Sequence, residues 1–387
     1  MMKGYLWVLL LTMTSMECVA GLSEAAKAYN VKDYQTAFKE FLPLATNGHA
    51  SAQFNLGVMY YNGKGVAQDY SQAVMWYRKA AAQGHASAQF NLGFMYDNGK
   101  GVAQDYSQAV GWYRKAAAQG DADAQSKLGI MHRYGQGVPQ NHSQAADWFR
   151  KAAAQGDADA QGVLGNMYYN GEGVAQNYSQ AVLWYRKAAD QGNADAQFLL
   201  GAMYYNGEGV AQDYSETVHW SRKAANQGHA SAQNALGFMY DNGKGVAQDY
   251  SQAVGWYRKA AAQGNADAQG ALGFMYDKGR GVAQDYSQAV GWYRKAGTQG
   301  HSRSLNNLGV FYEFGQLSAK NLVLAHIFYN LAAVNGNEKS VENRDQVTQQ
   351  LTSAQLSEAQ KIASQWVKGQ ALPTITKTYP SSSKKGK

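Results

Sequence analysis

The sequence has few of the residue patterns that mark an active site or a cofactor site. Its 387 residues include a single cysteine, Cys18, which has no second cysteine to pair with. There is no Gly-x-Ser-x-Gly elbow, and the loop at residues 62–66, Asn-Gly-Lys-Gly-Val, lacks the spacing of a phosphate-binding loop. No pair of carboxylates is set apart from the rest. We therefore predict no catalytic residue, no cofactor and no metal ion, and we expect that the protein is not an enzyme.

Long apolar segments are also missing. The apolar run from Tyr5 to Met13 is shorter than the ~20 residues that span a bilayer. Because it follows Lys3 and precedes the small residues Cys18 and Ala20, residues 1–20 are predicted to be a cleaved signal peptide. The mature chain is then periplasmic or secreted, without cysteine and without a membrane-spanning segment. A lipid anchor on Cys18 is the alternative.

The excess of basic residues is small. The chain has 35 lysines and arginines against 28 acidic residues, a formal net charge of +7. This excess alone does not predict a nucleic-acid partner, and none is expected. Residues 371–387 contain two prolines, three consecutive serines and a lysine-rich end, so they are predicted to be a disordered basic tail. Weak contact with an anionic envelope surface and simple solubilisation are both open as its role.

What the sequence does contain is a repeat of thirty-six residues. Eight copies run from His49 to Gly336 without insertion or deletion. They begin at His49, His85, Asp121, Asp157, Asn193, His229, Asn265 and His301. Because a period between twenty and fifty residues is typical of solenoids, we predict that each copy packs mainly on its neighbours. Below, positions thirty-six residues apart share a register, named by its first member.

Each copy reads as two antiparallel helices. From Ala50 to about Tyr61, apolar residues recur at spacings of three and four, which indicates a first helix, helix A. Gly63 and Gly65 then supply positive φ angles that end it. Asp69 is a suitable N-cap for a second helix, helix B, which ends before Gly84. At the copy boundaries, the shared register of histidine, aspartate and asparagine predicts helix caps rather than metal ligands.

Three registers are predicted to build the core. Seven methionines, from Met59 to Met275, form one of them, and the glycines at Gly57 and its equivalents mark close approaches between helices. The third consists of Trp76, Trp112, Trp148, Trp184, Trp220, Trp256 and Trp292. We expect this tryptophan ladder to be packed inside the solenoid.

The repeat resembles the Sel1-like repeat family, relatives of the tetratricopeptide repeats. The residues that carry the resemblance are Ala52, Leu56, Gly57, Tyr60, Gly63, Gly65, Val66, Asp69, Ala73, Trp76, Tyr77, Ala80, Ala81 and Gly84. The resemblance implies an all-α, right-handed solenoid of antiparallel helix hairpins that serves as an adaptor for protein complexes. The chain lacks the cysteines that fasten each repeat in cysteine-rich members, which weakens any transfer of their proposed activities.

Divergent segments flank the array. Residues 21–48 match helix B at Asp33 and Ala37 but place Glu40 where tryptophan stands, as suits a polar N-terminal cap. Residues 337–370 are predicted to form C-terminal capping helices, one of which runs through Leu356 and Trp366. The predicted order is therefore signal peptide 1–20, capping hairpin 21–48, repeats 49–336, capping helices 337–370 and tail 371–387.

Comparison of the copies locates a candidate binding surface. Positions needed for stacking must repeat, whereas positions that touch a partner are free to differ, and on helix A the differing positions share one face. We predict that this face lines a concave groove and that Phe90, Phe94, Phe238 and Phe274 are exposed there. The candidate groove residues are Phe54, Val58, Tyr61, Phe90, Phe94, Asp97, Arg133, Tyr169, Phe198, Tyr205, Phe238, Asp241, Phe274 and Asp277.

The leading functional hypothesis is a monomeric, secreted or periplasmic scaffold that binds a peptide or protein in this groove. Two alternatives stay open. One is a hydrolase, such as the β-lactam-hydrolysing activity proposed for cysteine-rich relatives, and the other is a purely structural envelope protein.

Overall fold

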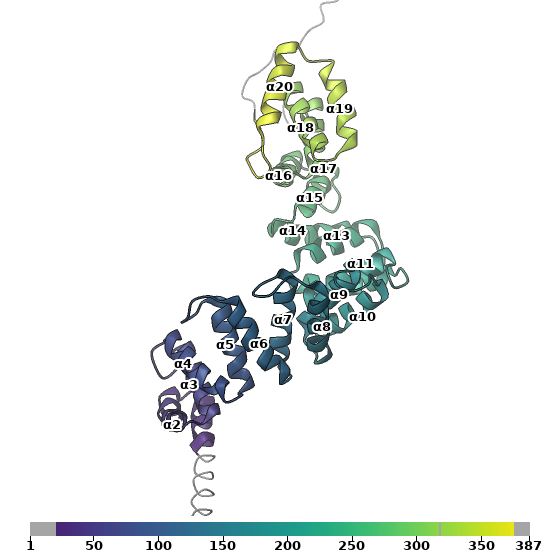
Figure 1. Cartoon of the computed structure of the whole chain (residues 1–387). Coiled ribbons are helices and arrows are strands. Elements are labelled where there is room, and N and C mark those ends of the chain that lie inside the picture. The colour runs from purple at the N-terminus through teal and green to yellow at the C-terminus, as the bar shows by residue number, and fades with distance from the viewer. Residues whose placement is uncertain (1–20, 317–318, 375–387) are drawn as a thin grey trace, which may run out of the picture. The chain divides into compact units, whose positions relative to one another are not determined.

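The computed structural model describes residues 21–316 and 319–374, and all of its regular elements there are helices (Figure 1). The predicted signal peptide and residues 375–387 of the predicted tail lie outside this range. The chain divides into two compact units, Met1–Gln191 and Gly192–Lys387. In both, the two helices of a repeat pack against each other, and helix B packs on helix A of the next repeat. The predicted all-α solenoid of helix hairpins is thus confirmed.

In the N-terminal unit, residues 21–30 are helical and precede nine further helices. These are α2 (Tyr34–Thr46), α3 (Ala50–Asn62), α4 (Tyr70–Ala82), α5 (Ala86–Asn98), α6 (Tyr106–Ala118), α7 (Ala122–Tyr134), α8 (His142–Ala154), α9 (Ala158–Asn170) and α10 (Tyr178–Asp190). The 21–30 helix and α2 share a core that includes Ala25 and Phe41, while Glu40 is exposed. Residues 21–48 thus form a divergent hairpin with a polar side.

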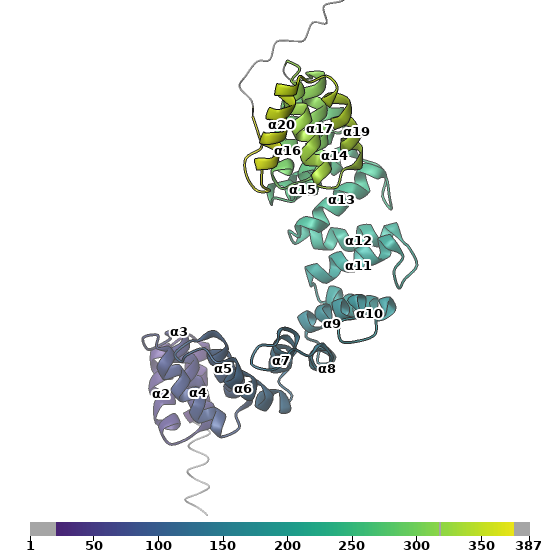
Figure 2. The same ribbon diagram turned by 45° about the horizontal axis from the view of Figure 1, so that its top comes forward.

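The C-terminal unit continues the pattern and adds two further helices. Its elements are α11 (Ala194–Asn206), α12 (Tyr214–Asn226), α13 (Ala230–Asn242), α14 (Tyr250–Ala262), α15 (Ala266–Lys278), α16 (Tyr286–Thr298), α17 (Ser302–Phe314), α18 (Leu322–Val334), α19 (Glu338–Thr348) and α20 (Ser353–Gln365). Both α19 and α20 pack on α18 (Figure 1). Figure 2 shows α19 and α20 beside α17 in the same unit. Leu372 is buried in the same core, so the packed chain extends past residue 370, where we expected the disordered tail to begin.

The core is built on tyrosine rather than on tryptophan. The methionines from Met59 to Met275 are all buried, as predicted. Of the seven tryptophans of the ladder, however, only Trp76 and Trp220 are buried. The other five are half-buried, with a lysine Nζ lying 3.9–4.2 Å from the ring centroid. The side chains at the centre belong to the adjacent Tyr77 register. The prediction that the tryptophan register forms the core is therefore wrong, because the core register is the next residue along helix B.

The helical glycines of the Gly57 register are close-approach points, as predicted. A Cβ placed on Gly57 would lie 2.5 Å from the ring of Tyr77 in the same repeat. In the other repeats with a ring at this position, the corresponding distance is at most 2.8 Å. Each of these glycines therefore makes room for an aromatic ring of helix B.

Buried glutamines connect successive hairpins, a feature that the sequence analysis did not identify. The Gln89 Nε2 atom donates to the Ala81 carbonyl of the preceding repeat at 3.1 Å. Gln119 Nε2 then donates to Gln89 Oε1 at 2.8 Å. In the first repeat, Gln83 Nε2 donates to Gln53 Oε1 in the same way, at 2.8 Å. Because an unpaired buried amide is costly, this arrangement explains why a polar residue recurs on an otherwise apolar face of helix A.

The helix caps agree with the sequence pattern. Asp69 accepts a hydrogen bond from the Gln72 amide, and Gly63 takes the left-handed conformation at φ 67°. At the repeat boundaries, His85 Nδ1 accepts from the Ala88 amide at 3.3 Å, in the same way as Asp121 accepts from Ala124 at 2.8 Å. The boundary histidines His85, His229 and His301 are thus caps, whereas His49 makes no such bond.

Because His85 caps through an unprotonated nitrogen, its contribution to stability should depend on pH. Burial lowers the pKa of His85 in the folded chain. The unfolded chain therefore binds protons more readily, and stability should fall as the pH drops below about 6.5, the ordinary histidine pKa. The loss is expected to approach the ~1 kcal/mol that is typical of a cap.

His85→Asn, which keeps a capping acceptor that does not titrate, should reduce this pH-dependent loss. Urea denaturation at pH 7.5 and pH 5.0, followed by circular dichroism, measures it. Asp121→Asn is the matched control and should leave the difference between the two pH values unchanged. An identical pH dependence in wild type and His85→Asn would contradict the prediction.

Candidate binding cavity

The Tyr61 register contacts the next repeat rather than only solvent. Lys100, from the loop of the following repeat, donates to Tyr61 Oη at 2.7 Å, and Lys244 donates likewise to Tyr205 at 2.9 Å. Where the register holds Arg133, the loop residue of the next repeat is Glu172, and the two form a bidentate ion pair at 2.7 and 2.8 Å. At these three positions, the residue of the register is matched to the loop residue of the next repeat.

The Phe54 register makes a second contact of this kind. Phe54 stacks on His85, the N-cap of the next repeat, with ring centroids 4.7 Å apart, and Phe198 stacks on His229 at 4.9 Å. Gly270 lies so close to His301 that a Cβ would approach within 2.6 Å. Variation between copies is thus no proof of partner contact, because part of it is matched between neighbouring repeats.

The predicted exposed phenylalanines are mostly half-buried. Phe90 packs against Tyr113 with centroids 5.6 Å apart, and Phe94 packs edge-on to Tyr61 at 6.4 Å. Phe274 is also half-buried, whereas Phe238 is 38% exposed. The expectation of exposure therefore holds for Phe238 and is wrong for Phe90, Phe94 and Phe274.

A cavity of about 930 Å³ opens among the helices of the C-terminal unit. Six of the fourteen candidate groove residues line it, all from repeats five to seven: Phe198, Tyr205, Phe238, Asp241, Phe274 and Asp277. The remaining eight lie in the N-terminal unit and take no part in this cavity: Phe54, Val58, Tyr61, Phe90, Phe94, Asp97, Arg133 and Tyr169. This cavity therefore contains only the six members of the predicted set that lie in the C-terminal unit.

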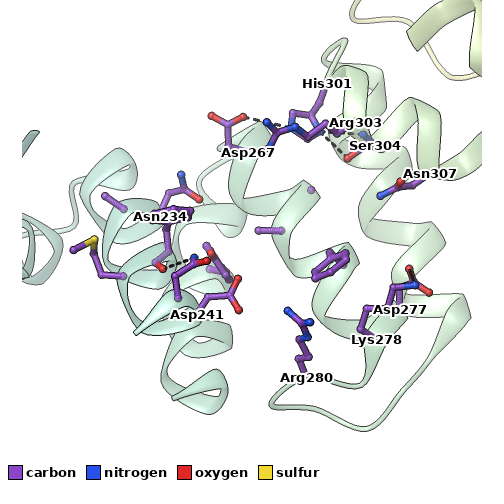
Figure 3. A pocket seen from close by; sticks show the side chains of 18 of the residues that line it. Asn234, Asp241, Asp267, Asp277, Lys278, Arg280, His301, Arg303, Ser304 and Asn307 are labelled. Atoms are coloured by element: carbon purple, nitrogen blue, oxygen red, sulfur yellow. Dashed lines mark hydrogen bonds and ion pairs between the residues drawn. The ribbon is translucent and has the colours of Figure 1, made fainter. Parts of the chain in front are cut away.

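Charged groups of both signs lie around the apolar rings. Figure 3 shows Asp241 on one wall and Asp277 beside Lys278 on another, with Arg280 between them. Asp277 and Lys278 form an ion pair at 3.0 Å. Burial raises the pKa of Asp241, an effect that Arg280 opposes, and the Asp241 Oδ1 atom is buried without a hydrogen-bond partner. The cavity thus combines apolar surface with charged groups of both signs.

His301 connects an aspartate and a serine at one side of the cavity (Figure 3). Its Nδ1 lies 2.8 Å from Ser304 Oγ, and its Nε2 lies 3.4 Å from Asp267. This order of groups resembles a hydrolytic triad, but Ser304 has no exposed surface and its amide is capped by the same histidine. A histidine–aspartate contact also joins His229 to Asp195. The arrangement is explained by capping.

Several lining residues were missed by the sequence analysis. Lys278 and Arg280 belong to registers that were not compared between copies, whereas Arg303 belongs to the variable Ser51 register of helix A but was not among the candidates. Thr217 and Ser221 stand in helix B of repeat five, where other copies have alanine and an aromatic residue. Reading helix B as well as helix A for departures from the repeat would have found these two. Among the residues that the structure describes, no three His, Cys, Asp or Glu side chains are grouped to hold a metal ion.

Comparison with known proteins decides the family. The Sel1 repeat profile matches eight consecutive segments, at residues 50–85, 86–121, 122–157, 158–193, 194–229, 230–265, 266–301 and 302–337. The chain belongs to the Sel1 repeat family. Proteins with Sel1 repeats are generally scaffolds for protein interactions. A comparison with curated protein sequences finds no match.

Two solved structures of Sel1-type proteins are similar over much of the chain. A protective antigen present in uropathogenic Escherichia coli strains, which displays an SLR fold, is 32% identical, with 97% of this chain and 99% of the antigen covered and a TM-score of 0.54. A Sel1 repeat protein from Oxalobacter formigenes is 35% identical, with 76% and 88% covered and a TM-score of 0.58. In the present chain, no helix of the described residues is long and apolar enough to cross a membrane.

Proposed function

We propose that this Sel1 repeat protein is a secreted or periplasmic adaptor that binds a peptide or protein segment in the cavity of its C-terminal unit. The observation that carries the proposal is the cavity itself, in which three phenylalanines, a tyrosine and two aspartates of the variable helix A face come together. A mixture of aromatic surface and a few polar groups is typical of sites for peptide-like ligands. Export is proposed from the pattern of residues 1–20.

Phe238→Ala tests the cavity directly. Phe238 is 38% exposed, and aromatic anchors of an interface commonly contribute ~2 kcal/mol or more. The mature chain, immobilised, would be used to capture proteins from an envelope extract and to select peptides from a random twelve-residue display library. Affinities of selected ligands, measured by calorimetry, should weaken roughly thirtyfold in Phe238→Ala.

Ile130→Ala is the matched control, because Ile130 occupies the same register in the N-terminal unit and is 36% exposed. It should bind the selected ligands as wild type does. Equal affinities of wild type and Phe238→Ala would overturn the proposal, as would a failure to select any ligand.

A further inference from the structure

Two arginines at the cavity depart from the repeat pattern. Arg303 is the only cation of the Ser51 register, in which every other repeat has serine or aspartate. It lies in the first turn of α17, where the positive end of the helix dipole favours acidic side chains over basic ones. Arg280 is the only arginine of the Lys64 register. Both arginines line the 930 Å³ cavity, and both are exposed.

Arg280 lacks the acceptor that its register has elsewhere. Lys100, its counterpart in repeat two, donates to Tyr61 Oη of the preceding repeat at 2.7 Å. The equivalent of that tyrosine for Arg280 is Asp241, but among the described residues the two form no ion pair. The Arg280 guanidinium carbon instead lies 5.3 Å from the ring centroid of Phe274. Its N–H groups are therefore available to a ligand.

Arg303 has no acceptor either. Its guanidinium forms no hydrogen bond and no ion pair with any residue that the structure describes. Figure 3 shows Arg303 beside His301 and apart from Arg280. A charge that opposes the helix dipole and has no partner within the fold costs stability, and such departures from local rules are expected at functional sites.

The acidic groups of the cavity are less accessible than its basic groups. Asp277 is 7% exposed and already pairs with Lys278 at 3.0 Å. Asp241 is half-buried, and its Oδ1 atom is buried. The third aspartate, Asp267, has an exposed side chain that lies 3.4 Å from His301. The charge that an entering ligand meets is therefore mostly positive.

We propose that the partner segment is acidic and that its carboxylates pair with Arg280 and Arg303. Its apolar side chains then contact the exposed edge of Phe238 and the ring of Phe274. Arginine suits this role because its planar guanidinium donates two parallel hydrogen bonds to one carboxylate. This inference rests on the proposed function and specifies its ligand.

Arg280→Gln and Arg303→Ser test the inference with little risk to the fold, because each introduces a residue that the same register has in other repeats. Peptides selected on wild type from the display library should be rich in aspartate and glutamate. By calorimetry, each substitution should weaken their binding roughly tenfold, because it removes a hydrogen-bonded charge pair. Arg303→Ser should nevertheless melt no lower than wild type, because it removes an unfavourable interaction with the helix dipole.

Lys100→Gln is the matched control. It removes one positive charge from the same loop position in the N-terminal unit, outside the cavity, and should bind the selected peptides within about twofold of wild type. Replacing the acidic residues of a selected peptide by their amides should weaken binding to wild type. The same replacement should have little further effect on the double variant Arg280→Gln/Arg303→Ser, because the paired groups are already gone.

Selected peptides without an excess of acidic residues, or equal binding to wild type and the double variant, would overturn the inference. If those peptides were still weakened by Phe238→Ala, the proposed function would stand while the inference failed. Insensitivity to Phe238→Ala as well would overturn both.

Discussion

Gly101→Ala is expected to destabilise the N-terminal unit by about 3 kcal/mol or more. Gly101 is the second glycine of its repeat loop, with φ at +69°, and an added Cβ would lie 2.3 Å from the Tyr70 carbonyl oxygen of the preceding repeat. The left-handed conformation alone costs a non-glycine residue ~1–2 kcal/mol. The clash adds to this because the opposing atoms belong to the backbone at the start of α4 and cannot rotate away.

Gly120→Ala separates these two effects. Gly120 also has a positive φ, +93°, but no atom lies within 4 Å of the added Cβ. This variant should show the conformational cost without the clash, and its midpoint in urea, followed by circular dichroism, should lie between those of wild type and Gly101→Ala. Equal destabilisation by the two substitutions would show that the loop does not seat tightly against the preceding helix.

Tyr113→Ala should cost about 3–5 kcal/mol, the usual range for removing a large aromatic side chain from a core. Tyr113 is 0% exposed, its ring lies against Gly93, and its hydroxyl donates to Asp97 at 3.3 Å. The substitution leaves a cavity between the two helices of repeat two and removes a donor from Asp97. Thermal melts and urea denaturation measure the loss.

The neighbouring Trp112→Ala is the informative comparison. Trp112 is half-buried, and Lys115 Nζ lies 4.0 Å from its ring centroid on the outer side. Because only part of the indole leaves water on folding, its removal should cost roughly half as much as the removal of Tyr113. A larger loss for Trp112→Ala would place the core on the tryptophan register after all.

Much of the local structure could be predicted from the sequence because its causes are local. Gly63 must end helix A because a positive φ is required there, and Asp69 must begin helix B because a first turn needs an acceptor for its free amides. The fixed period of thirty-six residues then carried the same assignments through every repeat. These inferences need no knowledge of how one hairpin meets the next.

Which residues face the core or a ligand was decided by the packing between helices. Trp76 and Tyr77 are adjacent and both aromatic, so only the rotation of helix B against Gly57 shows that tyrosine lies at the centre. Likewise, the contact of Tyr61 could not be predicted from its own repeat, because its hydrogen-bond donor is Lys100 of the next repeat, thirty-nine residues away. The cavity exists because Phe198, Phe238 and Phe274 of three successive repeats line one space, and that is a property of the close-packed array rather than of any segment of the sequence.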